Sequence, residues 1–68
     1  MDKQYLYGQL ELIDALIITA NRDMTAIVSA LMDEGPTEPI AQGERVRRAL
    51  SDAWYILATM KQQVKEIM

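Results

Sequence analysis

The most restrictive feature of this 68-residue chain is a pair of apolar heptad runs with a single break between them. The first run consists of Leu6, Leu10, Ile13, Ile17, Ala20, Met24, Ile27 and Leu31. The second run consists of Val46, Leu50, Ala53, Leu57, Met60, Val64 and Ile67. Steps of three and four residues keep side chains on one side of an α-helix, whereas a strand would alternate at every second residue. The sequence therefore predicts an all-α chain with two long helices.

The segment between the two runs contains residues that end one helix and start another. Gly35 suits the position just past a helix C-terminus, and Pro36 cannot continue that helix. Thr37 is expected to cap the second helix through its hydroxyl group. We therefore expect helices over about residues 3–34 and 38–67.

A short break between two long helices indicates an antiparallel helical hairpin, which forms a single domain over residues 1–68. In the expected register, the numbers of facing residues add up to about 77, so that Leu31 meets Val46. Gly8 and Gly43 are expected to be weak points, each costing about 1 kcal/mol relative to alanine in a helix.

Association is the expected route to stability, because the chain is short and contains neither cysteine nor histidine. Small domains without disulfides or metals usually depend on a partner subunit. We expect a symmetric homodimer that forms a four-helix bundle. Its predicted interface is a first apolar flank that contains Leu12, Leu16, Ala49 and Ile56. The alternative is a second flank of Ile18, Val28, Met32, Trp54 and Ala58.

The missing histidine and cysteine also restrict the chemistry that the chain can perform. Zinc, haem and iron–sulfur sites lose their usual ligands, and serine or cysteine triads lose their base. Glu11 and Asp14 lie one helical turn apart, and we interpret them as a solvated or ion-paired surface rather than as metal ligands. We therefore expect no enzymatic activity and no cofactor.

Charge is distributed unevenly along the chain, whose formal net charge is −3. Residues 1–41 carry seven acids and two bases, whereas residues 42–68 carry three acids and five bases. An acidic protein is a poor candidate for direct nucleic-acid binding. The basic cluster of Arg45, Arg47 and Arg48 can contact phosphates or an acidic partner, or it can be an ordinary solvated helix face.

The N-terminal segment does not have the pattern of a signal peptide, because Glu11 and Asp14 interrupt its apolar residues. Apolar runs such as Ala15–Ile18 are far shorter than the roughly 20 residues that cross a bilayer. We therefore expect a cytoplasmic protein that does not insert into a membrane.

Two groups of residues are predicted to contact a partner protein. The first group is the acidic turn, which contains Asp33, Glu34 and Glu38 and can complement a basic protein surface. The second group contains Trp54 and Tyr55, which belong to types enriched at interface hot spots, together with Arg48.

In length and layout the chain resembles the small phage-encoded anti-quorum-sensing proteins of Mu-like Pseudomonas phages, which are dimeric helical hairpins. The resemblance covers the helix over Tyr5–Asp33, the break at Gly35-Pro36 and the helix over Glu44–Ile67. It implies binding to a LuxR-type quorum-sensing activator of the bacterial host and a block of that activator's access to DNA. It also implies inhibition of the type IV pilus assembly ATPase, which would exclude other pilus-dependent phages.

A structural or assembly role remains open beside this hypothesis. In that case the apolar flank would dock onto a helix of a cognate small partner, as an antitoxin docks onto its toxin.

Overall fold

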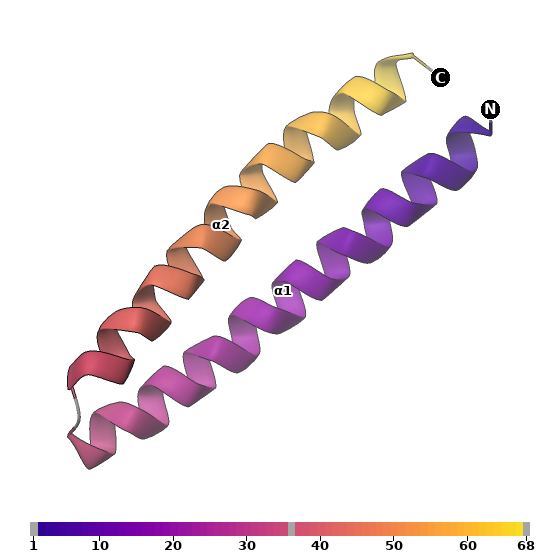
Figure 1. Cartoon of the computed structure of the whole chain (residues 1–68). Coiled ribbons are helices and arrows are strands. Elements are labelled where there is room, and N and C mark those ends of the chain that lie inside the picture. The colour runs from indigo at the N-terminus through magenta and orange to yellow at the C-terminus, as the bar shows by residue number, and fades with distance from the viewer. Residues whose placement is uncertain (1, 36, 68) are drawn as a thin grey trace.

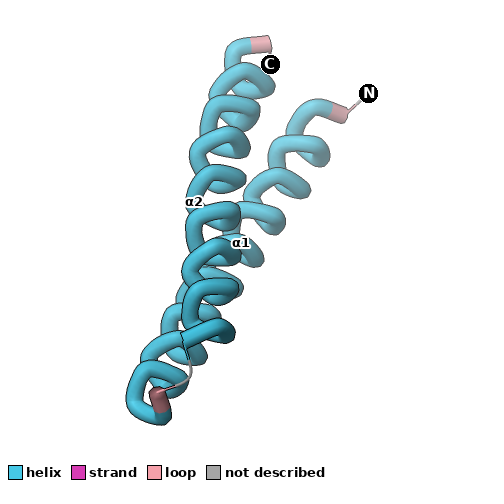
Figure 2. Tube along the Cα trace, turned by 60° about the vertical axis from the view of Figure 1, so that its left-hand side comes forward, coloured by secondary structure: helices cyan, strands magenta, loops and turns pink. Residues whose placement is uncertain are grey.

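The protein is an antiparallel pair of long helices in a computed structural model that describes residues 2–35 and 37–67. Helix α1 spans Lys3–Glu34 and helix α2 spans Thr37–Glu66. The two helices lie side by side along their whole length, with the chain termini at the same end (Figure 1 and Figure 2). The rod measures 50 × 15 × 12 Å and contains no strand within the described ranges. The predicted helical hairpin is therefore confirmed.

The ends of α1 are fixed by local hydrogen bonds. The Asp2 carboxylate accepts a bond from the backbone N–H of Tyr5 at 3.2 Å, so Asp2 caps the N-terminus. At the other end Gly35 has a φ of 96° and donates its N–H to the carbonyl oxygen of Leu31 at 3.1 Å. The prediction for Gly35 is confirmed, because this left-handed conformation favours glycine. Pro36 and the side chain of Thr37 lie outside the described residues.

The register between the helices differs from the expected one. Val28 lies against Gly43, and Asn21 reaches Ser51 with a side-chain distance of 3.5 Å. The numbers of these facing residues add up to 71 and 72, so the expected register with a sum of about 77 is wrong. The reason is the short connection, since α2 begins only three positions after α1 ends.

The contact between the helices uses only one half of each heptad run. In α1, Leu10 is buried and Ile17 is half-buried, whereas Leu6 and Ile13 of the same run are 37% and 45% exposed. In α2, Leu57 is buried while the other half of the run is exposed. Each helix is rotated about its axis relative to the prediction. The rotation brings other residues into the contact, namely Tyr7, Asp14, Asn21, Val28, Gly43, Arg47, Ser51 and Lys61.

Two predictions for individual residues therefore change. Val28, expected on an outer flank, is 2% exposed and belongs to the core. Gly43 is a buried point of close approach between the helices rather than only a weak point in α2. A Cβ atom at this position would lie 2.5 Å from Cγ2 of Val28.

Among the described residues, α1 is long and apolar enough to cross a membrane, by length and composition alone. The prediction from short apolar runs overlooked this property, because polar residues are spread thinly along the helix. It is weak evidence for a membrane span, since core helices of soluble proteins and signal sequences have the same property. In the hairpin, Asp14 near the middle of α1 is paired with Lys61 of α2.

Candidate interaction surfaces

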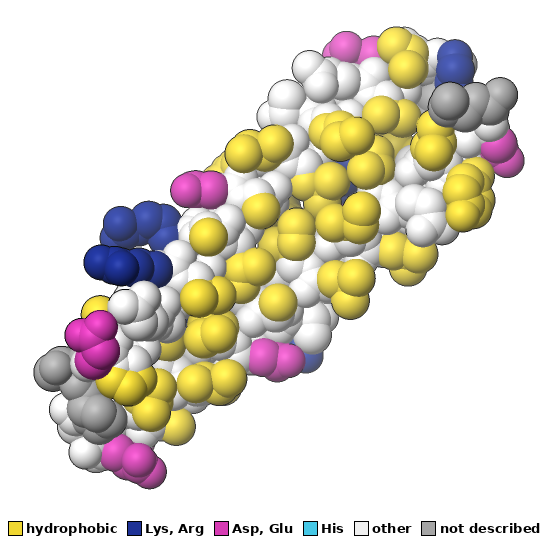
Figure 3. All heavy atoms as spheres, in the orientation of Figure 1, with side chains coloured by type: hydrophobic (Ala, Val, Ile, Leu, Met, Phe, Trp, Pro, Cys, Tyr) yellow, Lys and Arg dark blue, Asp and Glu magenta, His cyan; other side chains and the backbone are white. Residues whose placement is uncertain are grey.

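One broad side of the hairpin is covered by the heptad residues that the helix contact leaves outside. We call this side the apolar face and define it by Leu6, Ile13, Ala20, Ile27, Val46, Ala53, Met60 and Ile67. Its large side chains are between 37% and 64% exposed. Figure 3 shows hydrophobic side chains running along both helices on one side, with the charged side chains mostly at the margins. The two exposed half-runs thus form one continuous surface.

The predicted dimer residues extend this surface. Leu16 is 68% exposed and Ile56 is 70% exposed. Leu16 lies three and four residues from Ile13 and Ala20, and such spacings make side chains neighbours on a helix. Ala49 and Ile56 of α2 likewise lie three or four residues from members of the apolar face, such as Ala53. Leu12, 59% exposed, adjoins Leu16 farther round the helix.

On the side of the hairpin opposite the apolar face, a cluster of ion pairs and hydrogen bonds connects the two helices. We call it the polar clasp and define it by Glu11, Asp14, Trp54 and Lys61. The Asp14 carboxylate accepts hydrogen bonds from Lys61 Nζ at 2.8 Å and from Trp54 Nε1 at 2.7 Å. Lys61 Nζ also lies 3.0 Å from a Glu11 oxygen. The clasp therefore connects α1 and α2 through three charged side chains and one indole.

The clasp shifts the protonation equilibria of two of its members. The hydrogen bond from Lys61, supported by that from Trp54, lowers the pKa of Asp14 below 3.8. The hydrogen bonds to Asp14 and Glu11 raise the pKa of Lys61 above 10.5. Both groups therefore stay charged around neutral pH. Within the described part of the chain, no cluster of three or more His, Cys, Asp and Glu side chains is placed to hold a metal.

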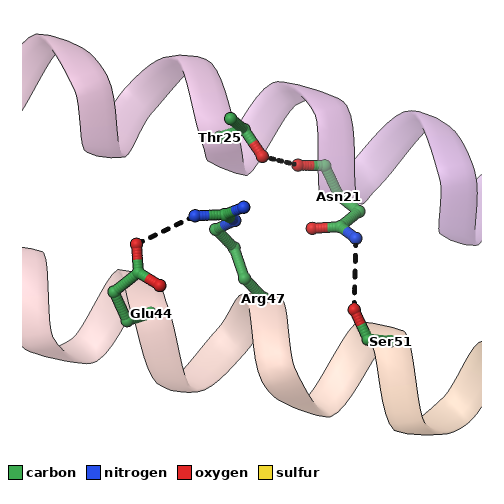
Figure 4. A network of polar contacts seen from close by, with 5 residues as sticks. All are labelled: Asn21, Thr25, Glu44, Arg47 and Ser51. Carbon is green, nitrogen blue, oxygen red and sulfur yellow. Dashed lines mark hydrogen bonds and ion pairs between the residues drawn. The ribbon is translucent and has the colours of Figure 1, made fainter.

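A second polar network lies nearer the turn (Figure 4). The Asn21 amide approaches the Ser51 hydroxyl, and an Arg47 guanidinium nitrogen donates to Glu44 at 2.9 Å. Thr25 donates its hydroxyl to the backbone carbonyl of Asn21 at 2.8 Å. Among the described residues, neither Asn21 Oδ1 nor Arg47 Nε finds a partner, although both atoms are buried. This part of the contact is therefore polar but incompletely paired.

A groove lies along the same polar side of the hairpin. Its larger hollow encloses about 360 Å³, and its lining includes Ile18, Asn21, Arg22, Ser51, Trp54 and Tyr55. A smaller hollow, lined by Glu44, Arg47 and Arg48, adjoins it at Ser51. Trp54 and Tyr55 form an edge-to-face pair with ring centroids 5.2 Å apart. We call the two hollows together the back groove.

The predicted partner-binding residues fall into two separate places. Trp54, Tyr55 and Arg48 line the back groove, and Tyr55 is 68% exposed. Asp33, Glu34 and Glu38 are exposed around the turn. At 1.5 Å per residue, Glu38 and Trp54 are roughly 24 Å apart along α2. The six residues therefore do not form one site.

The sequence patterns did not single out several residues that line the groove, among them Asn21, Arg22, Thr25 and Ser51. No local signal marks them, because they come from both helices and meet only in the observed register. Arg45, the remaining member of the basic cluster, is exposed and does not line the groove.

Comparison of the chain with models of protein families, with curated proteins and with solved structures finds no match.

Proposed function

We propose that the protein is a self-associating, non-catalytic binding protein. Two hairpins join through their apolar faces into a four-helix bundle, and the bundle acts by covering a surface of another protein. The observation that carries this proposal is the continuous, exposed apolar face along both helices. Exposed apolar patches that extend over a whole side of a molecule mark interaction sites.

The exposed area of the single hairpin supports the presence of a partner subunit. The hairpin exposes 5235 Å², whereas a compact folded chain of 7.7 kDa exposes about 4300 Å². The excess of about 900 Å² matches the roughly 800 Å² that each partner contributes to a standard protein interface. Only three hydrophobic residues of the described chain, Leu10, Val28 and Leu57, are buried.

A second copy is the occupant that the heptad pattern favours. Half of each run faces the neighbouring helix, and the other half lies on the apolar face. This arrangement is expected for a four-helix bundle, in which each helix packs against two neighbours and its apolar stripe points between them. A lipid surface is disfavoured, because the charged side chains closest to the face along α1, such as Asp23 and Glu34, are acidic.

Light scattering tests the self-association. At micromolar concentration we expect a molar mass of about 15 kDa, twice that of the 7.7 kDa chain. A mass near 7.7 kDa at the same concentration would overturn the proposed self-association. This holds even if the chain binds lipid vesicles, because the apolar face would then have an occupant other than a second copy.

The resemblance to phage anti-quorum-sensing proteins and the acidic turn together define the partner that we propose. Asp33, Glu34 and Glu38 lie exposed at one end of the rod, where they can complement a basic surface. The DNA-reading surface of a LuxR-type activator is of this kind, because DNA binding requires positive charge. The pilus assembly ATPase is the second partner that the resemblance implies. Binding of either partner requires no catalytic group.

Displacement of DNA from a LuxR-type activator tests this choice of partner. We expect the protein to release labelled operator DNA from the activator in proportion to its concentration. A variant with Asp33→Asn, Glu34→Gln and Glu38→Gln should lose most of this effect while keeping its molar mass. Failure of the dimeric wild type to release DNA would reject the activator as partner and favour the structural or assembly role.

A further inference from the structure

We propose that the back groove is a second binding site, which takes an acidic segment of a partner protein that also carries an apolar side chain. This inference rests on the proposed function in one respect: the side of the hairpin that carries the back groove must stay open to solvent when two apolar faces join.

The charges of the groove select an acidic occupant. Arg22, Arg47 and Arg48 line the two hollows, and Glu44 is the one acidic lining residue. Glu44 is already engaged with Arg47 at 2.9 Å, whereas Arg22 has only a long contact of 3.8 Å with Asp23. The groove thus has an excess of guanidinium groups on a protein whose net charge is −3. Guanidinium groups bind carboxylates with two parallel hydrogen bonds.

The larger hollow favours an apolar side chain next to the carboxylates of the proposed partner segment. Ile17, Ile18 and the Trp54–Tyr55 pair supply its apolar surface. The Trp54 indole is held in place by its hydrogen bond to Asp14, so this wall of the hollow is preorganised. Tyrosine, tryptophan and arginine are the residue types that dominate binding hot spots, and all three line this groove.

The groove remains accessible in the proposed dimer. Ile18 of the groove and Ile27 of the apolar face are nine residues apart, which places them on opposite sides of α1 at 100° per residue. Both are about half exposed, at 54% and 51%. Joining the apolar faces therefore leaves the groove in contact with solvent.

Titration of the full chain with short peptides tests the site, with the fluorescence of Trp54, the chain's one tryptophan, as the readout. The probe is an acetylated and amidated octapeptide with a central Glu-Leu-Glu-Glu sequence. We expect a saturable change in emission with this peptide and none with its counterpart that has lysine in place of glutamate. Arg48→Glu and Arg22→Glu should each weaken binding by about tenfold, as expected for loss of a hot-spot residue.

Two controls separate this site from the apolar face. Arg45→Glu changes the same charge outside the groove and should leave peptide binding within about twofold of wild type. Ile27→Asp, which targets the dimer face, should leave binding of the probe to folded chain unchanged. Equal binding of the lysine peptide, no saturable signal, or displacement of the acidic peptide by a single-stranded oligonucleotide would each overturn the proposal.

Discussion

We expect Ile27→Asp to convert the proposed dimer of about 15 kDa into a monomer of 7.7 kDa, as measured by light scattering. Ile27 lies on the apolar face and is 51% exposed in the single hairpin. In the bundle its side chain would be buried against the partner hairpin, where an unpaired carboxylate is strongly unfavourable. The substitution should lower the association constant of the dimer by several orders of magnitude. Because the hairpin has a small core, the helical signal should also melt at a lower temperature.

Ile18→Asp is the matched control for this prediction. It makes the same change in the same helix at a residue that is 54% exposed but lies on the opposite side. Helix propensity and net charge change equally in the two variants, so only position differs. Ile18→Asp should keep the molar mass of about 15 kDa. If both variants become monomeric, or neither does, the apolar face is not the dimer interface.

The helices and the turn could be predicted from the sequence, because local interactions determine them. The heptad spacing fixes the helix type, and the positive φ at Gly35 follows from the absence of a side chain. Neither feature depends on what the helices contact. The helix bounds accordingly agree with the prediction to within one residue at every end.

The contact between the helices could be predicted only in part, because the heptad pattern does not specify which neighbour a residue meets. Leu10 and Leu57 were expected in the contact and are buried, whereas Ile13 and Met60 were expected there and are exposed. A helix that packs against two neighbours and a helix that packs against one can show the same heptad spacing in the sequence. The spacing alone therefore does not tell how many neighbours each helix has. The exposed half of the pattern is thus the feature that most directly supports a second hairpin.

Glu11 and Asp14 were expected on a solvated or ion-paired surface, but their partner on the other helix could not be predicted. Asp14 and Lys61 are 47 residues apart, and only the short turn brings them to a distance of 2.8 Å. The back groove depends on the same register, since Asn21 of α1 and Ser51 of α2 both line it. Such clusters become visible only when the alignment of the two helices is known.

Gly43→Ala will destabilise the protein, although alanine is the better helix former. A methyl group on Gly43 would lie 2.5 Å from Cγ2 of Val28, which is 2% exposed and has a stiff, β-branched side chain. The gain in helix propensity is about 1 kcal/mol, whereas overpacking of this kind costs about 1–3 kcal/mol. We expect a net loss of up to about 2 kcal/mol in the free energy of unfolding by urea, at fixed protein concentration.

Gly8→Ala provides a control with the opposite sign. Among the described residues, no atom beyond its two chain neighbours and the adjoining helix backbone lies within 4 Å of a Cβ placed on Gly8. Helix propensity is therefore the main change, and the protein should gain about 0.5–1 kcal/mol. The double variant Gly43→Ala with Val28→Ala identifies the clash as the cause, because removing the Val28 methyl groups makes room for the new one. The free energy of unfolding that the double variant loses should be smaller, by about 1 kcal/mol or more, than the sum of the losses of the two single variants. Strictly additive losses would show that the close approach of the helices at Gly43 is not what opposes a larger residue.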